Sequence, residues 1–499
     1  MYPELEEVKR LAKSGEYKRI PVCRELYADR FTPVEVMRTL RAAGRHCFLL
    51  ESAENNQRWG RYSFLGYEPE LELTCTDGVL RVREAAGDGE VRERTEKTEH
   101  PGAAIRSVLR ERKSPKIKGM PPFCGGLVGY FSYEYFKYAE PTLRCGGECG
   151  DFRDADLMLF DKVIAFDHYR QKLLLIAGVP ADDADAGYLR AWKSLDEMES
   201  LLTSGAKAVF RPLKLKEELS PRFSKKEFCS MVESAKKYIR EGDIFQVVLS
   251  NPLSAAAEGS LFDTYRVLRT ANPSPYMFYF SSDDIEIAGA SPETLARLED
   301  GTLYTFPLAG TRRRGADERE DAELERELLA DEKELAEHNM LVDLGRNDVG
   351  RVCRLGSVTV ERYLDVLRFS HVMHIGSTVS GRLREDRDAV DAVDSILPAG
   401  TLSGAPKIRA CEIIRELEGG RRGIYGGAVG YLDFSGNMDT CIAIRLAYKK
   451  NGRVCVQSGA GIVADSEPER EFRECADKAQ AVVRALRAAE GGLRKCFCL

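Results

Sequence analysis

The sequence predicts an α+β fold in which large, mostly antiparallel β-sheets pack as a sandwich and are flanked by helices. Two observations favour this class. The predicted strands outnumber the helices that could cross between parallel strands, which argues against a doubly wound parallel sheet. Residues 71–74 and 79–82 alternate between apolar and polar side chains on either side of Asp77-Gly78, which is a typical turn of an antiparallel hairpin.

The first part of the chain mixes helices with short strands. Residues 32–35, Thr-Pro-Val-Glu, form a capping box with proline at the first helical position, so a helix is predicted to start there. Residues 157–166 and 172–177 are predicted to form another strand pair. Residues 84–102 are highly charged and nearly free of large apolar side chains, which predicts a surface loop or a solvated hairpin.

The later part of the chain begins with a helix. Ser224 and Glu227 form a second capping box, apolar residues follow at helical spacing, and Gly242 is predicted to end the helix. The apolar runs after it predict strands at 244–250, 285–290, 303–307, 428–432, 441–448 and 454–458.

Residues 331–352 predict one long helix with many acidic side chains. Helical spacing places Glu334, Glu337 and Leu341 on one face. Two carboxylates beside an apolar edge are costly unless a cation meets them, and hard oxygen ligands suit Mg²⁺. An acidic, solvated helix explains the same segment equally well.

A second acidic helix is predicted at 466–489, with a capping box formed by Ser466 and Glu469. Three charged side chains share one of its faces: Glu471, Glu474 and Lys478. The two helices therefore carry carboxylate pairs with the same spacing. Together they indicate a Mg²⁺ site with acid–base groups beside it.

Other candidate site residues lie in segments rich in small or apolar side chains. Glycines at 399–407, 426–430 and 458–463 would let backbone N–H groups approach an anion, although none fits a nucleotide-binding motif. Arg445 lies in a run predicted as an apolar strand and needs an anionic partner, either a substrate carboxylate or a structural salt bridge. His374 alternates with apolar residues, which is more typical of a core histidine than of a catalyst.

Several longer segments, taken together, carry a family resemblance. They are PLAGTRRRG (307–315), DEKELAEHNMLVDLGRND (331–348), HIGSTVSG (374–381), PAGTLSGAPK (398–407), YGGAVGY (425–431) and SGAGIVADSEPEREFRECADKA (458–479). The chain resembles the chorismate-using enzymes, and most closely the large synthase subunits (component I) of anthranilate synthases. The resemblance implies the fold of that family.

The resemblance also implies the site. It implies Mg²⁺ held by Glu337 and Glu474, with Glu334 as the acid for the leaving hydroxyl and His374 placed to assist. Thr401 and Lys478 match positions that support the chemistry. Chorismate's second carboxylate and ring would be held by Gly310, Thr311, Tyr425, Arg445, Gly459, Ala460 and Gly461.

Two positions indicate which reaction is favoured. Relatives that form isochorismate carry a lysine that activates water at the position of Gln246, and aminodeoxychorismate synthases commonly carry a lysine at the position of Ala309. Ammonia is therefore the expected nucleophile and anthranilate the expected product. The alternatives are an aminodeoxychorismate synthase component I and a non-catalytic tryptophan-sensing homologue.

The resemblance further implies partners and regulation. Ammonia would come from a separate glutamine amidotransferase subunit (component II), often in a heterotetramer. Ser52, Pro275, Tyr276 and Met277 resemble segments that bind tryptophan as a feedback inhibitor. The local alternative is a strand end packed on a proline-rich turn.

Composition and boundaries complete the expectations. A net charge of −6 without a basic stripe predicts no nucleic-acid partner, and no apolar stretch is long enough to span a membrane. The charged N-terminus lacks the apolar core of a signal peptide, so we expect a cytoplasmic protein. The predicted organisation is an N-terminal regulatory part (1–202), a linker (203–223), a chorismate-binding catalytic part (224–490) and a tail (491–499).

Overall fold

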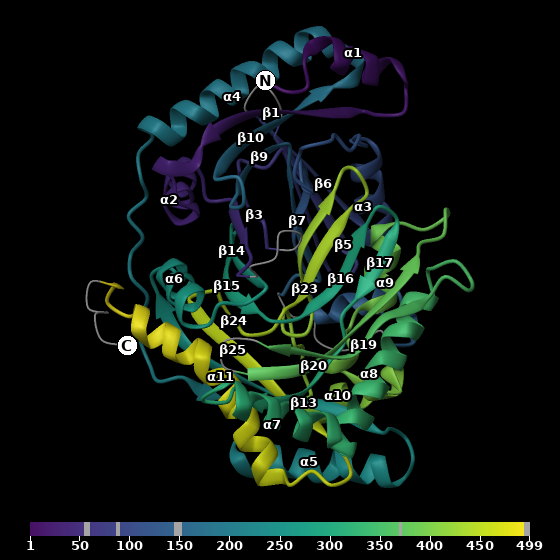
Figure 1. Cartoon of the computed structure of the whole chain (residues 1–499). Helices are drawn as coiled ribbons and strands as arrows, with labels where there is room; N and C mark the ends of the chain where they lie inside the picture. Colours follow the sequence, from purple (N-terminus) through teal and green to yellow (C-terminus); the bar gives the residue numbers. More distant parts are fainter. Residues whose placement is uncertain (54–59, 86–89, 144–151, 369–371, 494–499) are drawn as a thin grey trace.

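Two antiparallel sheets form the frame of the protein in a computed structural model that describes residues 1–53, 60–85, 90–143, 152–368 and 372–493 (Figure 1). Most of the predicted tail at 491–499 lies outside these residues. The first sheet contains 13 described strands. Their order is β1 (Arg19–Tyr27), β10 (Lys172–Pro180), β9 (Lys162–Asp167), β3 (Tyr62–Tyr67), β2 (Cys47–Glu51), β14 (Tyr276–Ser281), β15 (Ile285–Ser291), β24 (Leu446–Lys450), β25 (Arg453–Ile462), β13 (Gln246–Glu258) and β11 (Lys214–Leu215), with β12 (Ser220–Pro221) and β21 (Gly404–Ala405) also paired to β13.

The second sheet contains 12 described strands. Their order is β18 (Leu308–Arg313), β20 (Val372–Arg382), β17 (Thr302–Thr305), β16 (Thr294–Glu299), β23 (Met438–Ile442), β22 (Ala428–Asp433), β7 (Gly126–Phe131), β8 (Ala155–Phe160), β4 (Leu71–Thr76), β5 (Val79–Ala85) and β6 (Val91–Lys97), with β19 (Thr359–Arg368) also paired to β20. The described pairings are antiparallel, which confirms the predicted fold class.

The sheets face each other across an apolar, largely aromatic layer. Phe48 of β2 and Phe160 of β8 belong to different sheets, yet their ring centroids lie 4.7 Å apart in an edge-on arrangement. Phe64 and Tyr431 make a similar contact between β3 and β22, at 6.0 Å. The sandwich core therefore lies between the sheets.

Helices cover the outer faces. The outer face of the first sheet packs against α1 (Leu5–Lys13), α2 (Pro33–Ala43), α4 (Ala184–Ser204), α6 (Phe262–Ala271) and α11 (Pro468–Ala489), with α5 (Lys225–Arg240) and α10 (Lys407–Glu418) on β13 and β25. The outer face of the second sheet packs against α3 (Pro101–Arg110), α8 (Glu332–Gly350) and α9 (Ala389–Ile396), while α7 (Glu318–Ala330) packs on β18 and β20.

Most predicted elements are confirmed. The helices start at Pro33 and Lys225 behind the predicted caps, and the 331–352 helix is α8. The hairpin around Asp77 is β4–β5, and its third strand, β6, is exposed at every residue, as a solvated hairpin requires.

Two predicted strands are wrong in the same way. The chain at 157–166 is not one strand, because it leaves the second sheet after β8 and enters the first sheet as β9. Asp161 at this crossing pairs with Arg19 at 2.8 Å. The chain at 441–448 also crosses between sheets, from β23 to β24, and Arg445 in the crossing has φ +50°. Continuous apolar runs show no period, so they conceal such crossings.

Two further boundaries differ. The second acidic helix starts at Pro468, not at a capping box, because the Ser466 hydroxyl accepts a hydrogen bond from the backbone N–H of Val463 (3.1 Å) and not from the helix. β13 extends through Pro252 to Glu258, whereas the prediction ended at Ser250.

Each sheet contains strands from before and after residues 203–223, and the two groups meet at one strand pair: β2 with β14 in the first sheet and β7 with β22 in the second. The proposed boundary therefore separates sequence segments whose strands share sheets. Among the described helices, none is both long and apolar enough to cross a bilayer.

Candidate active site

The first turn of α8 is fixed against a bulge in β18. Asp331 caps α8, its side chain accepting from the N–H groups of Lys333 (3.1 Å) and Glu334 (3.2 Å). Strand β18 bulges at Gly310, where φ is +67°. A side-chain carbon at Gly310 would lie 3.2 Å from Glu334 Oε2, so glycine lets this carboxylate pack against the strand.

One turn further along α8, the half-buried Glu337 is close to groups that raise the pKa of its carboxyl and to groups that lower it. Burial raises the pKa of its carboxyl, and the negative charge of Glu334 raises that pKa further. A hydrogen bond from the Gln246 side chain and the positive charges of Lys333 and Lys478 lower it.

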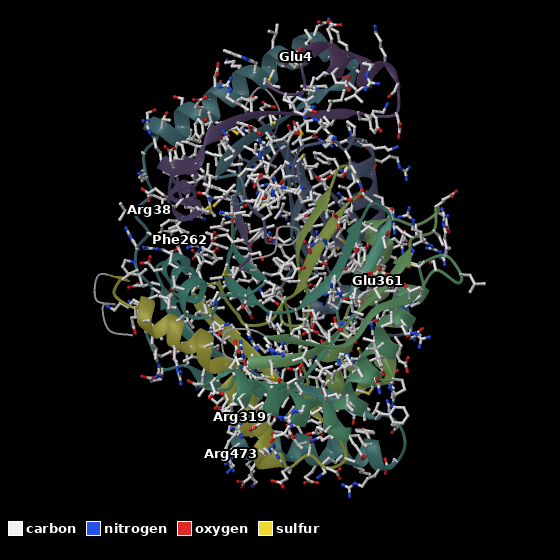
Figure 2. The ribbon with its side chains drawn as sticks, viewed as in Figure 1. Glu4, Arg38, Phe262, Arg319, Glu361 and Arg473 are labelled. Carbon is white, nitrogen blue, oxygen red and sulfur yellow. The ribbon has the colours of Figure 1, made fainter. Side chains whose placement is uncertain are left out.

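The start of α11 presents a similar group. Burial raises the pKa of the Glu471 carboxyl, as does the charge of Glu474, while Lys478 and Lys333 lower it. Lys478 forms an ion pair with Glu474 at 2.8 Å. The positive charges of Lys333 and Lys478 therefore act on carboxylates of both acidic helices. Figure 2 shows that α7 and α11 lie at the same end of the molecule, where Arg319 and Arg473 are labelled.

These carboxylates fit the Mg²⁺ that the family implies. Glu337 and Glu474 come from two helices and offer the hard oxygen donors that Mg²⁺ prefers. Burial is the main cause of the raised pKa values of Glu337 and Glu471, and the charge of a neighbouring glutamate, Glu334 or Glu474, raises each of them further. Mg²⁺ often takes only one or two protein carboxylates and completes its shell with substrate and water.

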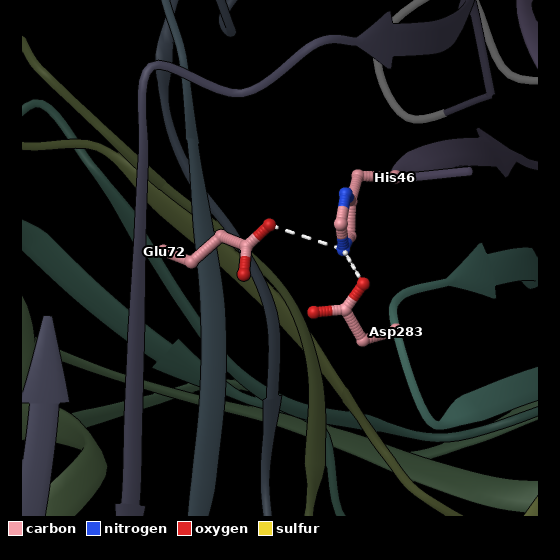
Figure 3. A group of neighbouring side chains, drawn as sticks. All are labelled: His46, Glu72 and Asp283. Carbon is pink, nitrogen blue, oxygen red and sulfur yellow. Dashed lines mark ion pairs between the residues drawn. The ribbon is translucent and has the colours of Figure 1, made fainter. Parts of the chain in front are cut away.

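A second group of side chains that could bind a metal ion lies outside this site and is joined by ion pairs. His46, Glu72 and Asp283 form the one set of three such groups whose ligand atoms lie within 4.8 Å of one another in the part of the chain that the structure describes (Figure 3). The His46 Nε2 atom lies 3.1 Å from an oxygen of each carboxylate. Arg83 binds the other oxygen of both carboxylates, at 3.3 Å (Glu72) and 2.6 Å (Asp283). We interpret the cluster as an ion-pair network that joins the sheets.

Sequence reasoning missed Glu293, which lies in the crossing from β15 to β16. The Thr401 hydroxyl donates to Glu293 Oε1 at 2.9 Å. Burial raises the pKa of Glu293 to about 7, although this hydrogen bond and the charges of Arg445 and Lys478 oppose the rise. A single carboxylate in a short crossing shows no helical or strand period, so its only signal in the sequence is a charged residue among small and apolar ones.

Arg445 and His374 lie close to the same carboxylates. Burial lowers the pKa of the Arg445 guanidinium, and Glu293 provides the opposing charge. His374 Nδ1 lies 2.9 Å from the Gly310 carbonyl oxygen and 3.1 Å from the Thr311 hydroxyl. Burial lowers the pKa of His374, which also responds to the charges of Arg445 and Glu334.

Two of the predicted glycines lie where a side chain would collide with residues of the site. A side-chain carbon at Gly459 would lie 2.8 Å from the Tyr425 hydroxyl oxygen, and one at Gly461 would lie 2.7 Å from the Gln246 amide nitrogen. Ala460 between them is fully buried on the opposite face of β25, against α5 and α10. The prediction of Ala460 as a substrate residue is therefore wrong, because alternate residues of a strand face opposite sides. The structure brings the other predicted catalytic and substrate residues, with Glu293 and Gln246, into one connected region.

A separate cavity of about 380 Å³ lies between the sheets. All four residues predicted for tryptophan line it: Ser52, Pro275, Tyr276 and Met277. The Tyr276 hydroxyl lies 2.8 Å from Asp439 Oδ1 and 2.9 Å from the Thr294 hydroxyl. Pro292 and Thr294, the neighbours of Glu293, belong to its wall, so the cavity and the site share one crossing.

Comparison with known proteins places this geometry in a family. Residues 14–484 match the family described as chorismate binding enzyme. The chain belongs to the chorismate-binding enzyme family. It is therefore an enzyme of a chorismate-using class, as the segments around Gly310, Glu337 and Gly459 predicted.

The similar members of this chorismate-binding family share both sequence and fold with the chain. Anthranilate synthase component 1 from Acetivibrio thermocellus is 44% identical over 98% of this chain and 99% of its own. The protein of the same name from Aquifex aeolicus is 43% identical over 97% and 98%. The solved structure of anthranilate synthase component I from Streptococcus pneumoniae matches with a TM-score of 0.74 at 39% identity, covering 85% of this chain and 92% of that one.

A more distant structure shows the fold alone. The menaquinone-specific isochorismate synthase from Escherichia coli matches with a TM-score of 0.66 at 21% identity, over 97% of this chain and 98% of that one. The fold of this chain is therefore similar to that of this isochorismate synthase.

Proposed function

We propose that the chain converts chorismate and ammonia to anthranilate and pyruvate in the presence of Mg²⁺, the first step of tryptophan biosynthesis. The high identity to relatives named anthranilate synthase component 1 supports the reaction class. The observation that carries the choice of nucleophile is Gln246, whose neutral amide contacts Glu337. An amide cannot deprotonate water, so this position favours ammonia, which needs no base.

Substrate binding follows from the charges of the site. In the described part of the chain, the structure records no ion pair for the Arg445 guanidinium, which makes a substrate carboxylate its natural partner. Glu337 and Glu474 would hold Mg²⁺ against the other carboxylate. The bound ion would withdraw electron density from the ring through that carboxylate. Tyr425, Gly459 and Gly461 would border the ring.

Proton transfer has two candidate donors. Glu334 lies 3.3 Å from the Arg312 guanidinium and forms an ion pair with it. Glu293, with a pKa of about 7, carries a proton in a large fraction of molecules near neutral pH. We therefore propose that Glu293 protonates the 4-hydroxyl group of chorismate, which leaves as water. At the same time, ammonia forms a C–N bond with the ring carbon next to the one that bears the carboxylate. Glu334, the donor expected from the resemblance, is the alternative.

The second half of the reaction releases pyruvate. Loss of the proton from the carbon that now bears nitrogen and cleavage of the enolpyruvyl C–O bond give the aromatic ring. His374 is held by the Gly310 carbonyl beside this region, and its lowered pKa favours the neutral form that can accept a proton.

We further propose that tryptophan binds the cavity between the sheets and inhibits the enzyme. The shared crossing supports this, because a ligand against Pro292 and Thr294 presses on the backbone that carries Glu293. We propose a cytoplasmic heterotetramer in which a glutamine amidotransferase subunit supplies ammonia, since the relatives are named as component 1 of a larger enzyme.

Replacement of Gln246 by lysine tests the choice of nucleophile. The variant should lose ammonia-dependent anthranilate formation and add a hydroxylated ring product, resolved by chromatography. If Gln246→Lys makes anthranilate at the unaltered rate and no hydroxylated product, Gln246 does not select the nucleophile.

A further inference from the structure

The three arginines at 312–314 contact two different helices. Arg313 pairs with Glu320, and Arg314 pairs with Asp321 through both carboxylate oxygens, so these two hold α7. Arg312 instead reaches α8, where its Nη2 donates to Asp331 Oδ2 at 2.7 Å. Among the described side chains of the run, Arg312 is the one that contacts the helix carrying the acidic residues of the site.

The Arg312 guanidinium contacts three groups at once. Besides Asp331, its Nη1 donates to Glu334 Oε1 at 3.3 Å and to the Thr311 carbonyl oxygen at 3.0 Å. It therefore ties its own strand, just past the Gly310 bulge, to the cap and the first turn of α8. A planar fork can bind two carboxylates in fixed directions, which an ammonium group cannot reproduce.

Each partner has its remaining oxygen committed elsewhere. The second oxygen of Asp331 caps α8, accepting from the N–H groups of Lys333 and Glu334. The second oxygen of Glu334 lies against Gly310, whose carbonyl oxygen contacts His374. The Glu334 carboxylate is thus held between Arg312 and the bulge, and one turn later the same helix presents Glu337.

We propose that Arg312 is a positioning residue that acts through Glu334, fixing the direction of this carboxylate and the place of the first turn of α8. The inference rests on the proposed function, because it assigns a role within that site. Arg312 needs no contact with chorismate to fulfil it.

A double-mutant cycle tests this role. Arg312→Met, Glu334→Gln and the double variant are compared by kcat and KM for chorismate with saturating ammonium and Mg²⁺. Arg312→Met should lower kcat by about tenfold or more with a smaller change in KM, because small misplacements of catalytic groups are costly. In the Glu334→Gln background the same change should have almost no further effect, whereas a merely structural role would multiply the two losses.

Two further variants complete the design. Arg314→Met removes a neighbouring arginine that holds α7, and it should keep kcat within about twofold. Arg312→Lys should restore only part of the rate, and it replaces Arg312→Met if circular dichroism shows that the latter is unfolded. Multiplicative losses in the cycle, or full activity of Arg312→Met, would overturn the proposal.

Failure of the proposed function is distinguishable from failure of this inference. If the unaltered enzyme forms no anthranilate, the reaction assignment fails. Titration calorimetry with chorismate then provides the same cycle in Kd. A Kd change caused by Arg312→Met that disappears in the Glu334→Gln background supports the positioning role, and independent or absent changes refute it.

Discussion

At the scale of single residues, the site depends on where protons reside. Glu293 and Glu334 are both carboxylates near Arg445 or His374, but burial favours the protonated form of Glu293, whereas Glu334 is paired with Arg312 at 3.3 Å. Glu293→Gln is expected to lower kcat by about a hundredfold or more, because a general acid contributes factors of this size. Glu334→Gln should cost less. A steady-state assay of anthranilate formation compares them, and a larger loss for Glu334→Gln would reverse the assignment.

The raised pKa of Glu293 also affects stability. Between its ordinary value of 4.5 and about 7 the folded protein binds a proton that the unfolded chain releases, so this group's contribution to stability falls as pH rises through that window. Glu293→Gln removes the penalty and should raise the melting temperature at pH 8 by about 1–2 °C, with little change at pH 4.5. Scanning calorimetry at both pH values measures this. An equal shift at both pH values would show that the carboxyl does not titrate as described.

Sequence reasoning reached the residues of the site unevenly. The pairs Glu334/Glu337 and Glu471/Glu474 each have helical spacing, so their faces could be predicted directly. Glu293 lies in a two-residue crossing and Arg312 in a basic run, and neither has a periodic context that reveals its neighbours. Only the folded chain brings Thr401 to Glu293 and Asp331 to Arg312.

At the scale of elements, two crossings between the sheets hold residues of the candidate site. The crossing after β15 holds Glu293, and the crossing after β23 holds Arg445. They are joined directly, since the Ile442 N–H donates to the Glu293 carbonyl oxygen (3.0 Å) and the Ser291 hydroxyl donates to the Ile442 carbonyl oxygen (2.7 Å). The apolar run at 441–448 predicts one continuous strand, although the chain crosses between the sheets within it. The crossings depend on tertiary packing, which local sequence does not encode.

The shared crossing leads to a test of the inhibitor cavity. Ser52→Phe places a large ring at the wall that also contains Tyr276 and Met277, so it should weaken inhibition by tryptophan by about tenfold or more. The rate without tryptophan should stay within about twofold of that of the unaltered enzyme, because the cavity is separate from the site. Ser204→Phe, at the exposed end of α4, is a matched control. Unchanged inhibition in Ser52→Phe would remove the cavity from the account.

At the scale of the whole molecule, the two sheets unite the chain. The fold class could be predicted from strand content and hairpin turns, but the order of strands could not, because β2 pairs with β14 and β7 with β22 across more than two hundred residues of sequence. The composition of residues 203–223 alone predicts a linker. The sandwich core, however, contains residues from both sides of this segment, such as Phe48, Phe160 and Tyr431.

Removal of residues 1–202 tests whether that linker is a domain boundary. The remaining chain would expose edges of both sheets and the aromatic layer between them, so it should lack a cooperative thermal transition and bind hydrophobic dyes. Circular dichroism and dye fluorescence measure both properties. A truncated chain that unfolds cooperatively and still turns over chorismate would establish an independent catalytic domain.

The most direct test of the account is chromatographic identification of the product formed from chorismate by the purified chain, with Mg²⁺ and excess ammonium at alkaline pH. Anthranilate and pyruvate in equal amounts, abolished by EDTA and restored by Mg²⁺, is the result that the geometry of Gln246, Arg445 and the acidic helices predicts. A para-amino product, a hydroxylated product, or turnover that continues unchanged in EDTA would contradict it.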